Sequence, residues 1–482
     1  MKKFIFFFFV IISSNTFPQL YEKLVEYNNS PELKNSQFSV YAEYCSSGKE
    51  IFSYNSQFAL APASNLKIFS SAVALCLLGS DFKYETNLYY SGNIEDGVLN
   101  GNIYIQGGGD PTLGSNRVKT STPLDSLLIL WSSEIKKLGI TKIYGSIIAD
   151  ASMYEKFTVP NYYPWIDIGN YYGAGTSALN IFDNLYYLYF KPGKQINDSA
   201  SVLRTYPFIK NLKFENDMKT GEEGSGDNGY IYNAPYSNNA YLFGTIPSGV
   251  NEFSIRGSIP NPPLTTCYLL QDELIKNSIT ISSSPYVVND KIDYTNSKLI
   301  YKHYSPELKD IVYMINKISF NLYAEQVFKT AGLKMFGEGT TYNGVKAVKR
   351  FLDSVGVPTD GLDLYDGSGL SRTNTITTKM MCKLLSFMTT QPTYDAFYNS
   401  LGIAGDPNDI SSFKNFGANT LIAKNARIKS GTINGVKSHS GYVKNKKGDL
   451  ISFSIITNNY DGSSSKLTNI HSKIVQMIAD DY

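Results

Sequence analysis

The chain has 482 residues, with 44 Lys and Arg against 42 Asp and Glu, which leaves a net charge of +2. This length predicts about three domains, and the lack of a basic surplus disfavours nucleic-acid binding, because phosphates need cations to neutralise them. Hydrophobic residues make up 42% of the chain and charged residues 18%, as in a globular protein. The histidines and cysteines have no zinc-site spacing, so we expect no metal and no cofactor.

Residues 1–19 are typical of an export signal. Met1-Lys2-Lys3 is basic, residues 4–12 form an unbroken apolar run, and small polar residues follow. An apolar run of about nine residues is too short for a transmembrane helix, which needs about 20, so a cleaved signal peptide is predicted. We therefore expect a mature protein without an integral membrane segment, exported to the periplasm or cell envelope.

Residues 20–80 begin with a predicted β-hairpin and continue into a helix. Residues 37–44 alternate with period two, and a turn leads to a second strand over residues 50–54. The helix predicted over residues 66–78 is apolar on nearly every face, which is typical of a helix in the core of a large domain.

Residues 81–295 differ in kind from the segments on either side. Tyrosine-rich alternating strands, predicted over residues 84–90, 185–190 and 253–259, are separated by Gly, Asn and Pro turns. We interpret this segment as a mainly β insertion of one or two subdomains. Gly107-Gly108-Gly109-Asp110-Pro111 lacks the Lys-Ser/Thr of a phosphate loop and is predicted to be a turn.

Residues 296–482 are predicted to be helical from 305 to about 388 and then to form a β-meander. Strands over 426–433, 436–443 and 450–456 are joined by turns at Asn434-Gly435 and at residues 445–448, and a helix follows over 467–479. The two N-terminal strands and these three predict one five-stranded antiparallel sheet, with the first and last helices packed on it.

A Ser-x-x-Lys motif, Ser64-Asn65-Leu66-Lys67, begins the apolar helix. Residues three apart lie on one helix face, and burial should lower the pKa of Lys67 toward neutrality. Lys67 could then take the proton of Ser64 for nucleophilic catalysis, with helix N–H groups available for an oxyanion. An N-capping serine beside a lysine that extends to solvent is the structural alternative.

Two further motifs follow in the order that penicillin-binding proteins and class A β-lactamases share. Ser319-Phe320-Asn321 lies in the helical segment, and Lys429-Ser430-Gly431-Thr432 lies on the first strand of the meander. Together with residues 62–67, 107–113, 316–325, 366–372 and 429–443, they make the chain resemble the type-4 penicillin-binding proteins, the D-alanyl-D-alanine carboxypeptidase/endopeptidases of peptidase family S13.

The resemblance implies an α/β (α+β) penicillin-binding-protein/β-lactamase-like transpeptidase fold. Its catalytic domain comprises residues 20–80 and 296–482 and is interrupted by the insertion of residues 81–295. The implied partners are peptidoglycan stem peptides and cross-links, with β-lactam antibiotics as covalent inhibitors.

The resemblance also implies a role for each motif residue. Ser64 is the nucleophile and Lys67 the base, Ser319 relays the proton to the leaving amine, and Asn321 binds the substrate amide. Lys429 adds positive potential that keeps Lys67 neutral, and with Thr432 it binds the terminal carboxylate; Ser430 and Gly431 complete this strand. The N–H groups of Ser64 and Thr432 form the oxyanion hole.

Two more positions are expected to recognise the side-chain end of a diaminopimelate residue in the substrate. Asp150 pairs with its ammonium group from the insertion, and Arg372 faces its carboxylate; a turn carboxylate without this role is the alternative for Asp150. The motifs depart from the family at Phe320, where Asp is usual, and at Ser430, where Thr is usual. Phe320 leaves the catalytic pair intact if its side chain points out of the cleft.

Three other functions are weighed on the same fold. A β-lactamase usually has an added base for deacylation, which is not identifiable in this sequence. A non-catalytic wall-binding relative would have lost at least one of the five motif residues. An esterase usually has Tyr in place of Ser319. The carboxypeptidase/endopeptidase function that the resemblance implies is therefore favoured.

Overall fold

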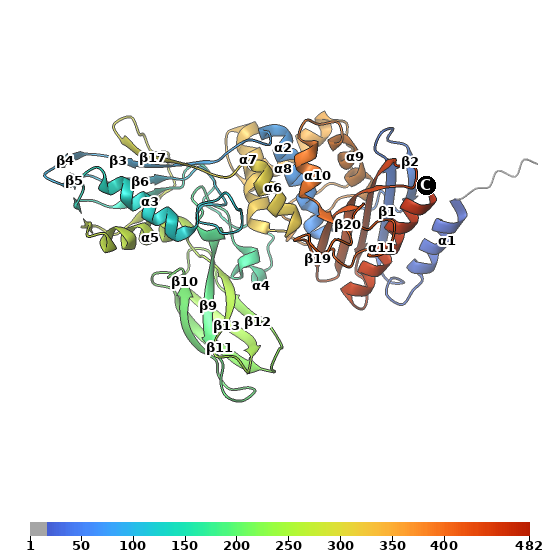
Figure 1. The fold of residues 1–482 in the computed structure, drawn as a ribbon, viewed down its shortest axis with the longest axis horizontal. Helices are drawn as coiled ribbons and strands as arrows, with labels where there is room; N and C mark the ends of the chain where they lie inside the picture. Colours follow the sequence, from blue (N-terminus) through green and yellow to red (C-terminus); the bar gives the residue numbers. More distant parts are fainter. Residues whose placement is uncertain (1–16) are drawn as a thin grey trace, which may run out of the picture.

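The computed structural model describes residues 17–482, and the molecule is elongated (Figure 1). A domain built on one large sheet lies at one end, and the inserted region extends away from it. Of the predicted signal peptide, only residues 17–19 are described, where they begin helix α1 (Phe17–Asn28). Among the described helices, none is long and apolar enough to cross a membrane.

The large sheet is antiparallel throughout, in the order β18-β19-β20-β21-β1-β2. Its strands are β1 (Gln37–Tyr44), β2 (Glu50–Tyr54), β18 (Gly402–Ile403), β19 (Arg427–Ile433), β20 (Val436–Lys444) and β21 (Leu450–Asn458). The pairing of β1 with β21 confirms that the chain's two ends share a sheet. The predicted number of five becomes six, because the two-residue β18 pairs with β19 and is too short to leave a pattern in the sequence.

Helices cover both faces of this sheet. On one face α1 packs beside α11 (Ser464–Asp481), and their apolar side chains form a core with the inward residues of β1, β20 and β21. The other face is covered by α9, and the remaining helices pack beyond it (Figure 1). These helices are α2 (Lys67–Leu78), α6 (Leu308–Lys317), α7 (Asn321–Phe336), α8 (Thr341–Ser354), α9 (Thr378–Met388) and α10 (Tyr394–Ser400).

The inserted region contains four small sheets. They are β16-β8-β6-β3-β17, β15-β7-β5-β4, β10-β9-β14 and β11-β13-β12. The strands are β3 (Glu85–Tyr90), β4 (Asn93–Glu95), β5 (Val98–Asn100), β6 (Ile103–Gln106), β7 (Lys142–Ile143), β8 (Ile147–Asp150), β9 (Leu185–Lys191), β10 (Ser201–Tyr206), β11 (Lys213–Gly221), β12 (Asn228–Tyr232), β13 (Asn239–Pro247), β14 (Phe253–Ser258), β15 (Thr280–Ile281), β16 (Tyr286–Val288) and β17 (Lys298–Tyr304).

Two long helices in this region went unpredicted. They are α3 (Leu124–Lys136) and α5 (Pro262–Lys276). A third helix, the short α4 (Trp165–Ile168), lies between the β11-β13-β12 sheet and the catalytic domain (Figure 1). Strand β17 follows the predicted boundary at residue 295, yet it pairs with β3. The domain limits drawn from the sequence therefore stay a prediction, and one strand beyond them joins the sheet of the insertion.

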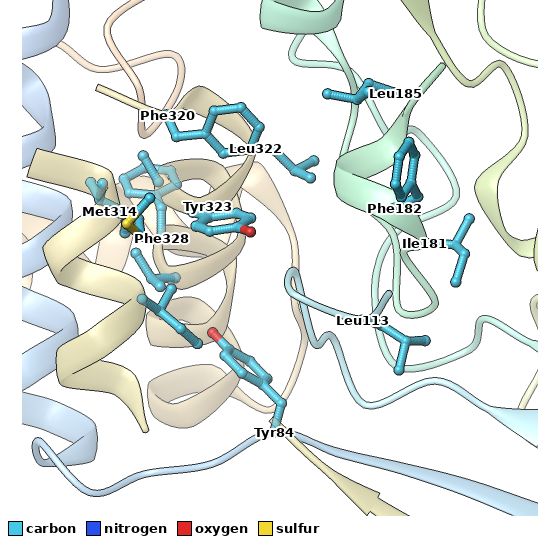
Figure 2. Packing of buried hydrophobic residues seen from close by; sticks show 14 of the residues in the cluster. Tyr84, Leu113, Ile181, Phe182, Leu185, Met314, Phe320, Leu322, Tyr323 and Phe328 are labelled. Carbon is cyan, nitrogen blue, oxygen red and sulfur yellow. The ribbon is translucent and has the colours of Figure 1, made fainter. Parts of the chain in front are cut away.

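One continuous core joins the insertion to the catalytic domain. Phe320, Leu322 and Tyr323 at the start of α7 face Leu113, Ile181, Phe182 and Leu185 of the insertion (Figure 2). The Tyr323 hydroxyl donates to the Asp183 carboxylate at 2.7 Å. The start of α7 is thus held by packing from both parts of the molecule.

Candidate active site

Ser64 lies in a 3₁₀ turn, Ala63–Leu66, that leads into α2 at Lys67. Ala63 has φ 47, a left-handed conformation that the surrounding structure must hold for a residue with a Cβ. The Lys67 side-chain nitrogen Nζ lies 2.9 Å from Ser64 Oγ. The turn therefore brings the two side chains into direct contact, as the Ser-x-x-Lys spacing predicts.

Lys67 is fully buried, and its surroundings favour the neutral amine. Burial lowers the pKa of Lys67 to about 7, against the opposing effect of the Asp366 and Glu325 carboxylates. Its Nζ also donates to the Ser368 carbonyl at 2.6 Å. A neutral Lys67 can accept the Ser64 proton near neutral pH, which a cation cannot do.

A buried carboxylate pair below Lys67 was missed by the sequence reasoning. Glu325 accepts from the Tyr163 hydroxyl at 2.9 Å and from the N–H groups of Gly367 and Ser368 at 3.0 and 2.7 Å. Burial and the Glu325 charge raise the pKa of Asp366, whose carboxylate accepts from backbone and amide N–H groups. Both acids lie in the stretches that carry the resemblance, which is the only signal the sequence offered.

The loop after Asp366 lies against the nucleophile turn. Gly369 has φ 82, and a Cβ there would come within 1.9 Å of the Ala63 carbonyl oxygen. Ser70 Oγ also donates to the Gly367 carbonyl at 2.5 Å. These contacts fix the loop that carries the Ser368 carbonyl against both Ser64 and Lys67.

Strand β19 places its Lys-Ser-Gly motif beside the same turn. Lys429 Nζ donates to Ser319 Oγ at 2.9 Å and to the Ser430 carbonyl at 2.7 Å. A Cβ on Gly431 would lie 2.9 Å from the Ser64 nitrogen and 2.4 Å from the Pro62 carbonyl, so only glycine allows this approach. Ser64, Lys67, Ser319 and Lys429 are thus brought together.

The two buried lysines, Lys67 and Lys429, repel one another. Burial is the main cause of the lowered pKa of Lys67. Burial and then the charge of Lys67 lower the pKa of Lys429 well below its usual value. Among residues 17–482 no carboxylate pairs with the buried Lys429, so an anion bound beside it would raise its pKa and favour its charged form.

Ser319 and Asn321 flank the start of α7. Ser319 has φ 60 in the link between α6 and α7, and Asn321 Nδ2 donates to the Tyr172 carbonyl at 2.7 Å. Phe320 turns the other way: it is 6% exposed, and its ring centroid lies 4.8 Å from that of Tyr323 (Figure 2). The Arg117 guanidinium lies over the Phe320 ring. The unusual Phe320 therefore points away from Ser319 and Asn321 and into the core.

Thr432 is exposed on β19, and its hydroxyl accepts from Lys437 Nζ at 2.9 Å. Lys437 lies opposite Thr432 on β20, and burial lowers the pKa of Lys437. Its charge also lowers the pKa of Lys429. Sequence reasoning did not include Lys437, because only the hairpin register brings it to the motif.

Asp150 is not brought to the site. It ends β8, accepts from the Tyr294 hydroxyl at 2.8 Å, and lines a pocket with residues 337–340 beyond the C-terminal end of α7. Asn321 begins that helix, whose 16 residues span about 24 Å. Arg372 instead acts electrostatically on Asp167 of α4, lowering a pKa that burial raises. Tyr172, beside Asn321, also hydrogen-bonds with Asp167.

Among residues 17–482, no cluster of three His, Cys, Asp or Glu side chains could hold a metal ion, and the four cysteines are free thiols.

Comparisons with known proteins agree with this arrangement. The family model of the D-Ala-D-Ala carboxypeptidase 3 (S13) family matches residues 20–481. A D-alanyl-D-alanine carboxypeptidase of Actinomadura sp. is 28% identical, over 90% of this chain and 79% of that protein. The D-alanyl-D-alanine carboxypeptidase DacB of Haemophilus influenzae is 25% identical, over 88% of this chain and 86% of that protein.

The fold matches a solved structure as well. Penicillin-binding protein 4 of Haemophilus influenzae has a TM-score of 0.81 with this chain, covering 95% of it and 99% of the solved chain at 22% identity. The expected penicillin-binding-protein fold is confirmed by this match. With the family model covering nearly all described residues, the chain belongs to the D-Ala-D-Ala carboxypeptidase 3 (S13) family.

Proposed function

We propose that this protein is a serine D-alanyl-D-alanine carboxypeptidase that acts on peptidoglycan stem peptides, and on cross-links between them, through an acyl-enzyme on Ser64. The observation that carries the proposal is the 2.9 Å contact between Ser64 Oγ and a buried Lys67 with a pKa of about 7. Membership of the S13 family supports the same reaction.

In the first step Lys67 takes the Ser64 proton, and Ser64 Oγ attacks the carbonyl carbon of the penultimate D-Ala. The N–H groups of Ser64 and Thr432 bind the oxyanion; the close approach of Gly431 to the Ser64 nitrogen supports this pairing. Ser319, in contact with Lys429, passes a proton to the nitrogen of the leaving D-Ala, and Asn321 binds the substrate amide.

Lys429 and Lys437 bind the terminal carboxylate of the substrate together with the Thr432 hydroxyl. Burial lowers the pKa of both lysines because it disfavours their charged forms, and a bound carboxylate stabilises those charged forms again. An internal peptide bond without such a carboxylate gains less from this pair, which favours cleavage at the chain end.

Asp167 and Arg372 bind the side-chain end of the substrate's third residue. They offer a carboxylate and a guanidinium within electrostatic reach of one another, and Tyr172 connects Asp167 to Asn321. A diamino acid that carries both an ammonium and a carboxylate group fits this pair. Asp167 takes the role that the sequence reasoning gave to Asp150.

Water then hydrolyses the acyl-enzyme, and penicillin, whose opened ring does not leave the site, remains attached to Ser64. The two carboxylates beside Lys67 are poorly placed to activate this water. Glu325 already accepts hydrogen bonds from three donors, and Asp366 accepts them from backbone N–H groups. The predicted export signal supports a reaction in the periplasm or cell envelope, where peptidoglycan is found.

Labelling of the purified protein with fluorescent penicillin tests the proposal, with intact mass to locate the adduct and Ser64→Ala as the control. A stable one-to-one adduct on Ser64, with release of D-Ala from a stem pentapeptide, is expected. Absence of both from a folded protein overturns the proposal, and rapid penicillin turnover without an adduct indicates a β-lactamase.

A further inference from the structure

A pocket with a volume of about 880 Å³ lies at the base of the β11-β13-β12 sheet, outside the cleft described above. Four of its lining side chains form a surface that we call the aromatic platform: Trp165 of α4, Tyr232 of β12, and Tyr241 and Phe243 of β13. The Trp165 and Tyr232 ring centroids are 6.2 Å apart and tilted by 37°, and those of Tyr232 and Tyr241 are 6.3 Å apart and tilted by 38°. The rings thus lie side by side rather than edge to face.

The platform is open to solvent. Trp165 and Phe243 are each 54% exposed, although they are large apolar side chains that a fold normally covers. Strand register places Tyr232, Tyr241 and Phe243 on one face of the sheet, since Tyr232 is paired with Tyr241 and Phe243 lies two residues further along β13. An exposed row of aromatic faces presents the negative side of the ring quadrupole to a ligand.

Asn233, at the end of β12, gives the pocket a polar contact. Its side chain is 3% exposed, and neither its Nδ2 nor its Oδ1 has a hydrogen-bond partner among residues 17–482. Buried amides are normally paired. Both atoms are buried, so a ligand reaches them only when the Asn233 side chain turns toward the pocket. A ligand with an amide of its own then satisfies both, because its carbonyl accepts from Nδ2 while its N–H donates to Oδ1.

We infer that this pocket binds an N-acetylated hexosamine of a glycan strand. The C–H face of a pyranose ring carries the partial positive charge that aromatic faces attract, and the acetamido group matches the unpaired Asn233. Lys213, Glu215 and Asn239 at the rim offer donors and acceptors for ring hydroxyls. A peptide ligand would use the amide but has no comparable need for a row of flat aromatic rings.

The location of the pocket agrees with such a ligand. Trp165 is two residues before Asp167 in α4, which packs against β12 and lies beside the catalytic domain (Figure 1). Asn170 fixes this arrangement, because it donates to the Ile166 carbonyl at 2.8 Å and accepts from the Ile231 N–H at 3.2 Å. A glycan in the pocket therefore lies next to the cleft in which its attached peptide is cut, an argument that rests on the proposed function.

Tryptophan fluorescence provides a direct test on the full protein. The chain has two tryptophans, and Trp131 is fully buried, so quenching by iodide reports mainly on Trp165. Chitotetraose should protect Trp165 from iodide in a saturable manner, while the unacetylated glucosamine tetramer should bind about tenfold more weakly, since it cannot pair with Asn233. Ser64→Ala should bind both tetramers in the same way, so a failure of the proposed catalysis can be distinguished from a failure of sugar binding.

Two variants and a matched control complete the test. Phe243→Ala should weaken chitotetraose binding about tenfold, and Asn233→Ala should abolish the preference for the acetylated tetramer. Phe208→Ala, which removes an aromatic ring 65% exposed outside the pocket, should change neither. Should Asn233→Ala fail to fold, Phe243→Ala and the two tetramers still decide the matter.

Turnover distinguishes a substrate site from incidental sugar binding. With Phe243→Ala, KM should rise about tenfold for a disaccharide-linked pentapeptide and stay constant for the free pentapeptide. Equal protection of Trp165 by both tetramers, or by none, overturns the inference. Protection by free stem peptide without any effect of chitotetraose overturns it in favour of a peptide site.

Discussion

Lys67 depends on burial for its chemistry, so its protonation should govern the rate of reaction with penicillin. In the proposed mechanism the neutral amine is the reactive form, and the pKa of about 7 lies below that of a lysine in water. We expect the second-order rate constant of acylation to rise with pH through about 7 and then to level off. Lys67→Arg, which cannot be deprotonated, should lower that rate at least about a hundredfold at every pH. A flat profile in the native protein would contradict this role.

Glu325 acts on Lys67 through charge, because its carboxylate raises the pKa that burial lowers. In Glu325→Gln this opposition is lost, so the pH midpoint of acylation should move to lower pH. The amide also meets the N–H groups of Gly367 and Ser368, at a cost of about 1–3 kcal/mol in the free energy of unfolding. Stability is measured by denaturant titration and the midpoint by stopped-flow acylation. An unchanged midpoint with reduced stability would leave Glu325 a structural role only.

At the scale of elements, the approach of β19 to the nucleophile turn depends on Gly431. A Cβ there overlaps the Pro62 carbonyl and the Ser438 hydroxyl, each 2.4 Å away. Gly431→Ala should therefore displace β19 and slow acylation about a hundredfold, since a shift of about 1 Å misaligns the reacting groups. Gly435→Asn is the matched control, because Gly435 has φ 75 at the open tip of the same hairpin and Asn tolerates this conformation. Similar losses in both variants would mean that the hairpin as a whole is the cause.

Phe320 joins the start of α7 to the core of the insertion. Phe320→Ala should lower the free energy of unfolding by about 3–5 kcal/mol through the cavity it leaves, and Phe320→Leu by less. Acylation by penicillin at a temperature where both variants are folded should change little, because the ring faces away from Ser319 and Asn321. A large kinetic defect in a stably folded Phe320→Leu would show that the side chain also shapes the cleft.

At the scale of the whole molecule, one hydrophobic core extends from the helices of the catalytic domain into the insertion. We expect peptides around Leu113 and Ile181 to unfold together with those of α7, since their side chains pack against one another (Figure 2). Hydrogen–deuterium exchange along a denaturant series, read by mass spectrometry, measures this. Acylation by penicillin should protect both sets equally. Exchange of the insertion peptides at lower denaturant concentrations would indicate two independent folding units.

Much of the site could be predicted because its residues lie in short local motifs. Ser64 and Lys67 share one turn and helix, and the Lys429 motif lies on one strand, so spacing and order were sufficient. Lys437 and Asp167 could not be found in this way: hairpin register brings the first to Thr432, and the packing of α4 brings the second toward Arg372. Asp150 was placed wrongly because its strand ends near the far end of α7, which no local pattern reveals.

The sequence by itself determined the family, the strands at both ends of the chain and the serine and lysine motifs, because periodicity, turn residues and motif spacing are local properties. Tertiary structure alone decided which way Phe320 points, which carboxylates oppose the low pKa of Lys67, and which aromatic rings line a shared pocket. These features depend on burial and on contacts between segments that are far apart in the chain. Desolvation and packing depend on distances between atoms in the folded protein, and a linear sequence does not contain these distances.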